Sequence, residues 1–337
     1  MFYQKPIFFN QNRVFRVYTG GKLLGQFLGK NFQDDFYPEE WIASDVCAMN
    51  EGSSDEYEGI SKISDENIYF SDAIKKHKKE LLGDYDKLNI LVKYLDSAVR
   101  LPVQAHPTKD FSKKHFNSCH GKEECWYILD TRPDACVYFG FWEGVTKEIF
   151  TEAIEKSEHD KNIMEELLVR HNVKKGDMIY IPAKTVHAIG PGCLILEVQE
   201  PTDFTIQPER WCVDYKLSDY QMYLGLDRCT AMECFDFKLS DNTFITPKII
   251  SENDGVTTEA LVDNDITSSF SVSRISILNG SYDLNEKVAI YIVTEGEGII
   301  CGDGYEKKIK QGDYFFLPAA ADNFKIKSEK ITLLLCK

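Results

Sequence analysis

"VKKGDMIYIPAKTVHAI", residues 173–189, has a second copy in this 337-residue chain, "IKQGDYFFLPAAADNFKI" at residues 309–326. Both copies carry a lysine two residues before Gly-Asp, then four mostly apolar positions and Pro-Ala. A second pair of similar segments precedes them. "ECWYILDT" from Glu124 lies upstream of the first copy, and "VAIYIVTE" from Val288 lies upstream of the second. Self-similarity of this kind indicates one structural unit that is used twice. We therefore expect two small β-barrels of one design, joined near residues 215–245.

Short runs of β-branched and aromatic residues, bounded by Gly, Pro and Asp, predict strands around the first copy. Several short strands separated by turn residues favour a sandwich or barrel over a parallel sheet. We therefore expect a mainly β protein. The four clearest runs are "ECWYILD" at 124–130, "ACVYFGF" at 135–141, "DMIYIPA" at 177–183 and "CLILEVQ" at 193–199.

Two segments show helical patterns and are expected to cover a sheet. Residues 71–95 have a start signal at Ser71 or Asp72, and Gly83 divides them into two helices. Residues 146–171 repeat apolar pairs at helical spacing, which predicts a further pair of helices.

The repeat and the helical segments together predict two domains. The N-terminal domain is expected to span residues 1–240, with helical insertions at 45–100 and 145–172, and the C-terminal domain to span residues 241–337. The acidic stretch at residues 45–65 has few apolar residues and several Gly and Ser, so we expect a surface loop there.

Composition excludes several classes of partner. The formal net charge is −15, which argues against nucleic acid because affinity for its backbone comes from clustered Lys and Arg. No apolar run approaches the roughly 20 residues of a membrane-spanning helix, and the start "MFYQKPIFFNQNRVF" lacks the plan of a signal peptide. The ten cysteines form no CxxC pair, so free thiols and a cytoplasmic location are expected.

A candidate metal site comes from polar residues within apolar strands. In the extended stretch "LPVQAHPTKDF", which begins at Leu101, Gln104 and His106 point to the same side. Glu124 opens the next strand, and His187 lies on a turn after "YIPA". Imidazole nitrogens with carboxylate and amide oxygens suit a divalent transition metal such as Zn²⁺.

Each of these side chains also has an ordinary structural interpretation when taken singly, as a hydrogen-bonded histidine, a structural amide or a solvated strand end. The repeat supplies an internal comparison. Aligning its two copies places Asn323 opposite His187 and Val288 opposite Glu124. The fold therefore does not require these two side chains, which favours a metal site in the N-terminal barrel and a C-terminal barrel that lacks the ligands.

At these residues the sequence resembles the class I mannose-6-phosphate isomerases, a zinc-dependent family built on the cupin barrel. The resemblance covers most of residues 1–215, and it implies two cupin domains, which are jelly-roll β-barrels, with helices inserted in or packed on the N-terminal one. The matching motifs are "QAHP" at Gln104, "GKEECW" at Gly121, "GDMIYIPAKTVHAIG" at Gly176 and "LEVQEPTDFT" at Leu196, with weaker matches in "YTGGKLL" at Tyr18 and "EEWIASD" at Glu39.

The resemblance implies that the substrate is a small sugar phosphate, and that the enzyme interconverts mannose 6-phosphate and fructose 6-phosphate. The proton on C2 must be removed and returned at C1 through an enediol, whose oxygens a bound cation is suited to stabilise. Zinc is the expected ion, although Mn²⁺, Fe²⁺ and Co²⁺ also suit these ligands. The oligomeric state is not predicted. The implied metal ligands are Gln104, His106, Glu124 and His187.

The resemblance also implies roles for residues around the metal. Lys122 and Asp203 match family positions near the reacting carbons and are the expected catalytic residues, while Gln104, Lys122 and Gln207 are expected to contact substrate. Taken alone, Lys122 is equally a solvated lysine at a strand edge, and Asp203 a turn former.

Two positions depart from the family pattern. Pro102 stands where many members have a serine, and Gln207 stands where the family has an active-site arginine, which would supply a permanent cation. Arg210, three residues later, is the candidate to replace that arginine. These departures keep two alternatives open: an isomerase or epimerase of a different sugar or sugar phosphate, and a non-catalytic metal-binding cupin that senses sugars.

Overall fold

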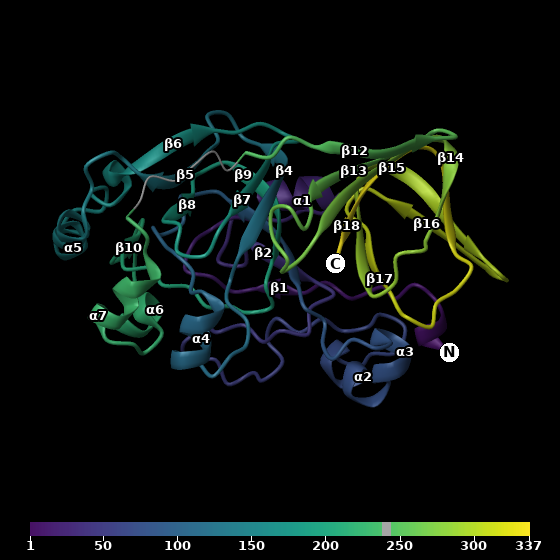
Figure 1. Ribbon diagram of the computed structural model, residues 1–337, viewed down its shortest axis with the longest axis horizontal. Coiled ribbons are helices and arrows are strands. Elements are labelled where there is room, and N and C mark those ends of the chain that lie inside the picture. Colours follow the sequence, from purple (N-terminus) through teal and green to yellow (C-terminus); the bar gives the residue numbers. More distant parts are fainter. Residues whose placement is uncertain (238–243) are drawn as a thin grey trace.

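The computed structural model describes residues 1–237 and 244–337, which we call the N-terminal and C-terminal halves. The two halves lie side by side along the long axis (Figure 1). The predicted domain boundary at residues 240 and 241 falls outside the described residues, so the domain division stays a prediction.

The N-terminal half is built on two antiparallel sheets. The larger has six strands in the order β1-β2-β3-β9-β4-β7, and the smaller has three in the order β6-β5-β8. The larger sheet contains β1 (Arg13–Val14), β2 (Glu39–Ile42), β3 (Leu91–Ser97), β4 (Glu124–Thr131), β7 (Met178–Ile181) and β9 (Cys193–Gln199), and the smaller contains β5 (Cys136–Phe141), β6 (Leu168–Asn172) and β8 (His187–Ile189).

The C-terminal half contains a seven-stranded sheet that repeats part of this order. The sequence β3-β9-β4-β7 recurs as β14-β18-β15-β17, so the long strands β4 and β15 have equivalent neighbours. This arrangement confirms the predicted repeat. The strands are β12 (Lys248–Asn253), β13 (Val256–Val262), β14 (Val272–Asp283), β15 (Ala289–Gly302), β16 (Tyr305–Lys310), β17 (Tyr314–Leu317) and β18 (Lys325–Cys336).

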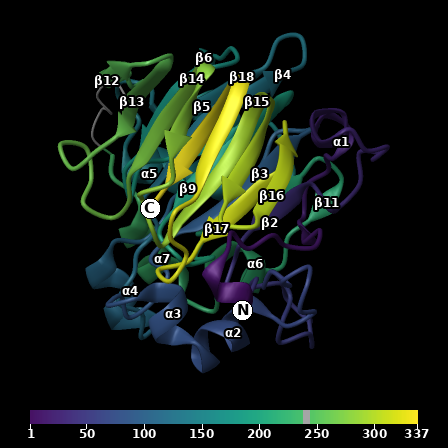
Figure 2. The same ribbon diagram turned by 90° about the vertical axis from the view of Figure 1, so that its right-hand side faces the viewer.

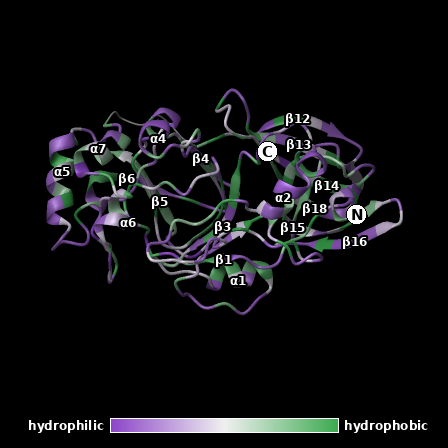
Figure 3. Ribbon diagram, turned by 90° about the horizontal axis from the view of Figure 1, so that it is seen from below, coloured by the Kyte–Doolittle hydropathy of each residue, from purple (hydrophilic) through white to green (hydrophobic). Residues whose placement is uncertain are grey.

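Short helices cover the sheets from outside, with α5 at one end of the molecule and α2 and α3 below (Figure 1). Helix α5 shows both hydrophilic and hydrophobic residues (Figure 3), and it buries Phe150, Ala153 and Ile154. The helices are α1 (Lys22–Leu28), α2 (Phe70–Lys76), α3 (Lys78–Leu82), α4 (Lys109–His115), α5 (Lys147–Lys156), α6 (Asp219–Tyr223) and α7 (Arg228–Ala231), with 3₁₀ turns at Phe2–Gln4, Glu165–Leu167 and Met232–Cys234 and a small hairpin of β10 (Trp211–Cys212) and β11 (Tyr215–Lys216).

The two large sheets pack face to face. Seen from the C-terminal half, β14, β15 and β18 lie in front of β3 and β9 (Figure 2). Side chains alternate along β4, so Cys125 and Tyr127 join the apolar layer between the halves while Trp126 and Ile128 face the interior of the N-terminal half. Glu124 shares that interior side, which places the candidate site inside the N-terminal half.

The mainly β fold and the four predicted strands are confirmed as β4, β5, β7 and β9. Two helical predictions are wrong in their second halves. Residues 91–97 form β3, whose seven residues are all buried at the centre of the sheet, and residues 168–172 form β6 after a single 3₁₀ turn. Within the described residues, no helix is long and apolar enough to span a bilayer.

Candidate active site

Two histidines and a glutamate meet inside the N-terminal half. Nε2 of His106 lies 3.1 Å from one carboxylate oxygen of Glu124, and Nε2 of His187 lies 3.4 Å from the other. One donor atom from each residue can be chosen so that all lie within 4.8 Å of one another, and no more than 1% of any of the three is exposed. The side-chain amide of Gln104 reaches the same place, 3.2 Å from Nε2 of His187.

Backbone carbonyls orient both imidazole rings. Nδ1 of His106 lies 3.0 Å from the carbonyl oxygen of Phe204, and Nδ1 of His187 lies 2.8 Å from that of Thr185. An Nδ1–H that donates to these carbonyls leaves the Nε2 lone pair directed at the shared centre. When one ring nitrogen binds a metal, a hydrogen bond from the other ring nitrogen holds the histidine in one tautomer and one ring orientation.

The charge states of the cluster suit a cation. Burial lowers the pKa of His106 to about 3 and also lowers the pKa of His187, so both rings are neutral and can donate a lone pair. Burial opposes ionisation of Glu124, but Lys122 and the two histidines outweigh it and hold the pKa of that carboxyl well below its usual value. Oε2 of Glu124 lies 3.0 Å from Nζ of Lys122 and 3.1 Å from Nε2 of His106. This donor set fits a divalent metal ion.

Lys122 lies against the cluster. Its Nζ atom is 2.9 Å from Nε2 of His106 and 3.0 Å from the Glu124 carboxylate, and only 4% of its side chain is exposed. The lysine is therefore buried beside the candidate metal ligands, and the interpretation as a solvated strand-edge residue does not hold.

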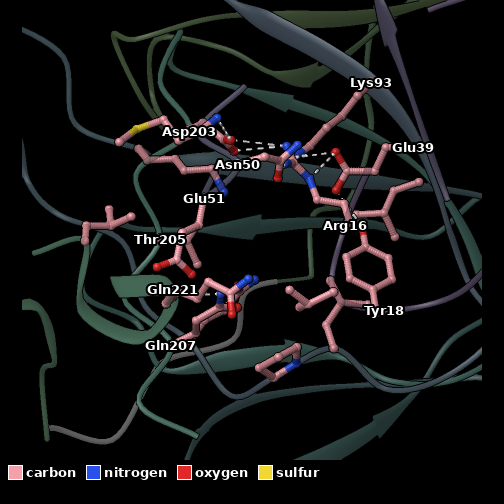
Figure 4. A pocket seen from close by; sticks show the side chains of 18 of the residues that line it. Arg16, Tyr18, Glu39, Asn50, Glu51, Lys93, Asp203, Thr205, Gln207 and Gln221 are labelled. Atoms are coloured by element: carbon pink, nitrogen blue, oxygen red, sulfur yellow. Dashed lines mark hydrogen bonds and ion pairs between the residues drawn. The ribbon is translucent and has the colours of Figure 1, made fainter. Parts of the chain in front are cut away.

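From Lys122 a row of alternating charges runs along the wall of one cavity, and Figure 4 shows the end of this row formed by Lys93, Glu39, Arg16 and Asp203. Glu197 lies 3.9 Å from Lys122 and 3.0 Å from Lys93. Glu39 lies 3.8 Å from Lys93 and 3.1 Å from Arg16. Arg16 in turn donates to both oxygens of Asp203 at 3.2 Å. We call these seven residues the ion-pair row: Glu124, Lys122, Glu197, Lys93, Glu39, Arg16 and Asp203.

Burial and neighbouring charges give Glu197 and Glu39, the two glutamates in the middle of the ion-pair row, different pKa values. Burial, with the nearby Glu124 carboxylate, raises the pKa of Glu197 to about 7. Burial also disfavours the charged form of Glu39, but Arg16 and Lys93 outweigh it and hold the pKa of Glu39 at about 2. One acid of the row therefore titrates near neutrality, and the other stays ionised.

The structure brings four of the eight predicted site residues to the lining of this cavity, together with Pro102. Pro102, Gln104, Lys122, Asp203 and Gln207 line it. Nε2 of Gln207 donates to the backbone carbonyl of Gln221 at 3.0 Å, so Gln207 supplies no cation to the cavity, whose lining also includes the Glu51 carboxylate.

Arg210 is not among the residues that line the cavity. Its guanidinium is paired with Glu158 at 2.5 Å and with Asp219 at 2.8 Å. The predicted replacement for the family arginine therefore directs its charge away from the cluster.

Sequence reasoning missed Arg16, Glu39, Lys93 and Glu197. For two of them a signal was present, because Lys93 and Glu197 interrupt the apolar runs "NILVKYL" and "CLILEVQ". A charged residue within a buried strand needs a partner of opposite charge. Lys93 and Glu197 are directly opposite each other on β3 and β9.

Comparison with known proteins places residues 265–335 in the family model for the cupin domain of mannose-6-phosphate isomerase. The chain is 34% identical over 259 residues to mannose-6-phosphate isomerase ManA of Bacillus subtilis, covering 74% of this chain and 76% of the relative. It is 32% identical over 270 residues to the probable mannose-6-phosphate isomerase GmuF of the same organism, covering 76% of this chain and 78% of the relative.

Solved structures agree over nearly the whole chain. The crystal structure of mannose 6-phosphate isomerase from Bacillus subtilis superposes with a TM-score of 0.78 at 25% identity, covering 99% of this chain and all of that one. A mannose 6-phosphate isomerase bound with zinc and yttrium superposes with a TM-score of 0.70 at 16% identity, covering 98% of this chain and 99% of that one. The second likeness shows the fold alone.

Proposed function

Because the chain belongs to the mannose-6-phosphate isomerase family, we propose that it is a metal-dependent isomerase that interconverts mannose 6-phosphate and fructose 6-phosphate. The observation that carries this function is the buried cluster of His106, Glu124 and His187, which lies beside a cavity lined by three cations and four carboxylates. The C-terminal half matches the family's cupin domain, and its strand register places Ala289 at the position of Glu124, because Ala289 pairs with Leu317 before Pro318 as Glu124 pairs with Ile181 before Pro182. The predicted equivalence of Val288 and Glu124 is therefore wrong by one residue, while the sequence alignment places Asn323 opposite His187. We therefore assign catalysis to the N-terminal half.

Zinc is the ion that we propose for the cluster, because two imidazoles and a carboxylate are ligands that zinc favours. A bound divalent cation supplies a Lewis acid that stabilises negative charge on the sugar oxygens. The proposed ligands are Gln104, His106, Glu124 and His187.

Two side chains of the cavity are suited to handle protons. The ammonium group of Lys122, held at the cluster by Glu124, donates hydrogen bonds to the sugar oxygens as charge develops on them. Glu197, whose pKa burial raises to about 7, takes the proton from C2 and returns it at C1. A hydroxyl proton must also move from O2 to O1, so the Lys122 ammonium gives a proton to O1 and recovers one from O2. Both side chains are regenerated, so the isomerisation needs no other reactant.

Asp203 lines the same cavity, and its role in proton transfer stays a prediction. Its carboxylate receives both Nη2 contacts of Arg16 and the backbone amide of Met49 at 2.8 Å. These contacts place it at the far end of the ion-pair row, whereas Lys122 and Glu197 are at the end beside the metal ligands.

Turnover of mannose 6-phosphate, measured with metal content, tests the proposed function. We expect metal-loaded protein to form fructose 6-phosphate, a chelator to abolish the reaction and added Zn²⁺ to restore it. Glu124→Gln should lose both metal and activity. Asp203→Asn should lose activity with its metal retained if Asp203 carries a proton.

The neighbouring Glu123→Gln is the matched control, because Glu123 accepts from Thr267 and Ser269, away from the cluster. It should keep metal and turnover. Metal-loaded protein that forms no fructose 6-phosphate, or turnover that is indifferent to the chelator, would contradict the proposed function.

A second candidate function is isomerisation of a different sugar or sugar phosphate. It is favoured by the uncharged side chains of Gln207 and Pro102, which line the cavity where the family pattern has an arginine and a serine. A panel of aldoses and aldose phosphates decides between the two, since a higher kcat/KM for any sugar other than mannose 6-phosphate would select the second.

A further inference from the structure

Arg16 is the cation of the cavity that lies farthest from the metal ligands. We propose that it binds the phosphate group of the substrate, an assignment that rests on the proposed function.

Strand order gives the distance of each charge from the cluster. Glu124, Glu197, Lys93 and Glu39 stand on β4, β9, β3 and β2, which are consecutive neighbours in the sheet. Since neighbouring strands are about 4.8 Å apart, β2 lies about 14 Å from β4 across the sheet, and the register displaces Glu39 further from Glu124 along the strands. Nε of Arg16 pairs with Glu39 at 3.1 Å, so the guanidinium lies at the end of the row that is remote from Glu124. A hexose 6-phosphate carries its phosphate on C6, remote from C1 and C2, and therefore needs a cation remote from the metal.

The other two cations are less available to a phosphate. Lys122 is engaged by His106 and Glu124 at the cluster. Lys93 lies between Glu197 and Glu39 with 5% of its side chain exposed, whereas 12% of the Arg16 side chain is exposed.

The Arg16 guanidinium has only neutral partners at Nη1, which a phosphate oxygen can replace. Nε donates to Glu39 and Nη2 to Asp203, but Nη1 donates to the amide oxygen of Asn50 at 3.1 Å and to the backbone carbonyl of Phe15 at 3.4 Å. Asn50 lines the cavity and belongs to the predicted surface loop. A charged phosphate oxygen makes a stronger hydrogen bond to a guanidinium than an amide oxygen does. Exchange at Nη1 would leave both existing ion pairs intact.

The ring of Trp41 fixes the plane of the guanidinium. The Arg16 side chain lies over this ring at 5.1 Å, and Trp41 itself is fully buried. A stacked guanidinium presents its donors in one direction, which a flexible lysine does not.

Inhibition by inorganic phosphate provides a test that does not depend on the sugar. We expect Arg16→Gln to raise the inhibition constant of phosphate and the KM for mannose 6-phosphate by about tenfold or more, with a smaller change in kcat. Binding of inorganic phosphate is also measured directly by calorimetry on the metal-loaded protein. The assignment would be overturned if folded Arg16→Gln binds phosphate as tightly as the wild type. It would also be overturned if Lys93→Gln loses phosphate binding while Arg16→Gln keeps it.

A second variant guards against misfolding, because Arg16→Gln leaves the buried carboxylates of Glu39 and Asp203 without their partner. Asn50→Asp combined with Glu58→Gln keeps Arg16 paired and puts a negative charge where the phosphate oxygen would bind, so it should weaken phosphate binding by a similar factor. The second change is needed because the amide nitrogen of Asn50 donates to Glu58, whose carboxylate would otherwise face the new one. The matched control is Asn67→Asp with Glu58→Gln, which makes the same charge change at an exposed position that does not line the cavity. Equal phosphate binding by the two variants would overturn the proposal.

The outcomes separate this assignment from the proposed function. A wild-type protein that binds phosphate through Arg16 but does not turn over mannose 6-phosphate would contradict the proposed function alone. If the wild type turns over mannose 6-phosphate but the Arg16 and Asn50 variants bind phosphate as the wild type does, only the assignment of Arg16 is contradicted.

Discussion

Glu197 is the residue whose charge state should control the pH dependence of the enzyme. Burial raises the pKa of its carboxyl to about 7, and the Glu124 carboxylate adds to the rise, while Lys93 and Lys122 oppose it. A general base must be deprotonated to accept a proton, so we expect kcat to fall as the pH drops below about 7. Glu197→Gln should reduce kcat by about 100-fold or more and remove this acid limb. A kcat profile from about pH 5.5 to 9 measures both effects.

A nearby buried glutamate provides the control for this prediction. Glu200 is 2% exposed and accepts from the backbone amide of Glu123, but it is not among the residues that line the cavity. Glu200→Gln should therefore keep the pH profile of the wild type. An acid limb that persists in Glu197→Gln would assign the titration to another group.

At the scale of elements, β2 is the strand whose polar residues most affect stability. Glu39 accepts from Trp41, Tyr18 and Arg16, and its pKa is about 2 compared with 4.5 in a model compound. A lowered pKa means that the folded state favours the carboxylate. The stabilisation is therefore present above pH 4.5 and is lost as the pH falls towards 2. Glu39→Gln should lower the free energy of unfolding by about 3 kcal/mol at neutral pH. Urea unfolding at pH 7 and at about pH 3 measures the change and its loss.

Glu40, the next residue of β2, provides a control, because its pKa is shifted in the opposite direction to that of Glu39. Glu40 lies on the other face, its pKa is raised by burial, and one of its oxygens has no hydrogen-bond partner. Glutamine is a close replacement for a carboxyl that favours its neutral form, so Glu40→Gln should be far less destabilising than Glu39→Gln at pH 7. Equal losses in the two variants would show that the charge of Glu39 is not what stabilises the strand.

The same strands show which parts of the fold the sequence could predict. Strands near the repeat were predictable because turn residues bound their apolar runs. β3 was not, because a strand that is buried on both faces has no alternation that separates it from a buried helix. The candidate ligands were predictable because His106 and Glu124 each lie within a local strand pattern. Arg16 was not, because its contact with Asp203 joins residues 187 positions apart.

At the scale of the whole molecule, the two halves share one apolar layer. Val92, Leu196 and Val198 of the first large sheet pack in the same buried cluster as Ile292 and Leu334 of the second. A hydrogen bond from Tyr314 to Glu40 at 3.0 Å crosses the same boundary. Each half alone would expose this layer to water, so we expect the two halves to unfold as one cooperative unit.

Two adjacent leucines of β18 test this cooperativity, because they face opposite sides of the sheet. Leu334 packs in the layer between the halves, and Leu333 packs in the interior of the C-terminal half. All four tryptophans, at positions 41, 126, 142 and 211, lie in the N-terminal half, so tryptophan fluorescence reports on that half alone. Leu333→Ala should destabilise the C-terminal half by about 2–5 kcal/mol.

If the halves unfold together, Leu333→Ala shifts the urea midpoint of tryptophan fluorescence as far as that of circular dichroism. Leu334→Ala should shift both midpoints as well, because its side chain contacts the N-terminal half directly, and it serves as the positive control. A fluorescence midpoint that stays at the wild-type value in Leu333→Ala, while circular dichroism shows an earlier transition, would mean that the halves unfold independently. In that case the N-terminal half would keep its ion-pair row and candidate metal site without support from the second cupin unit.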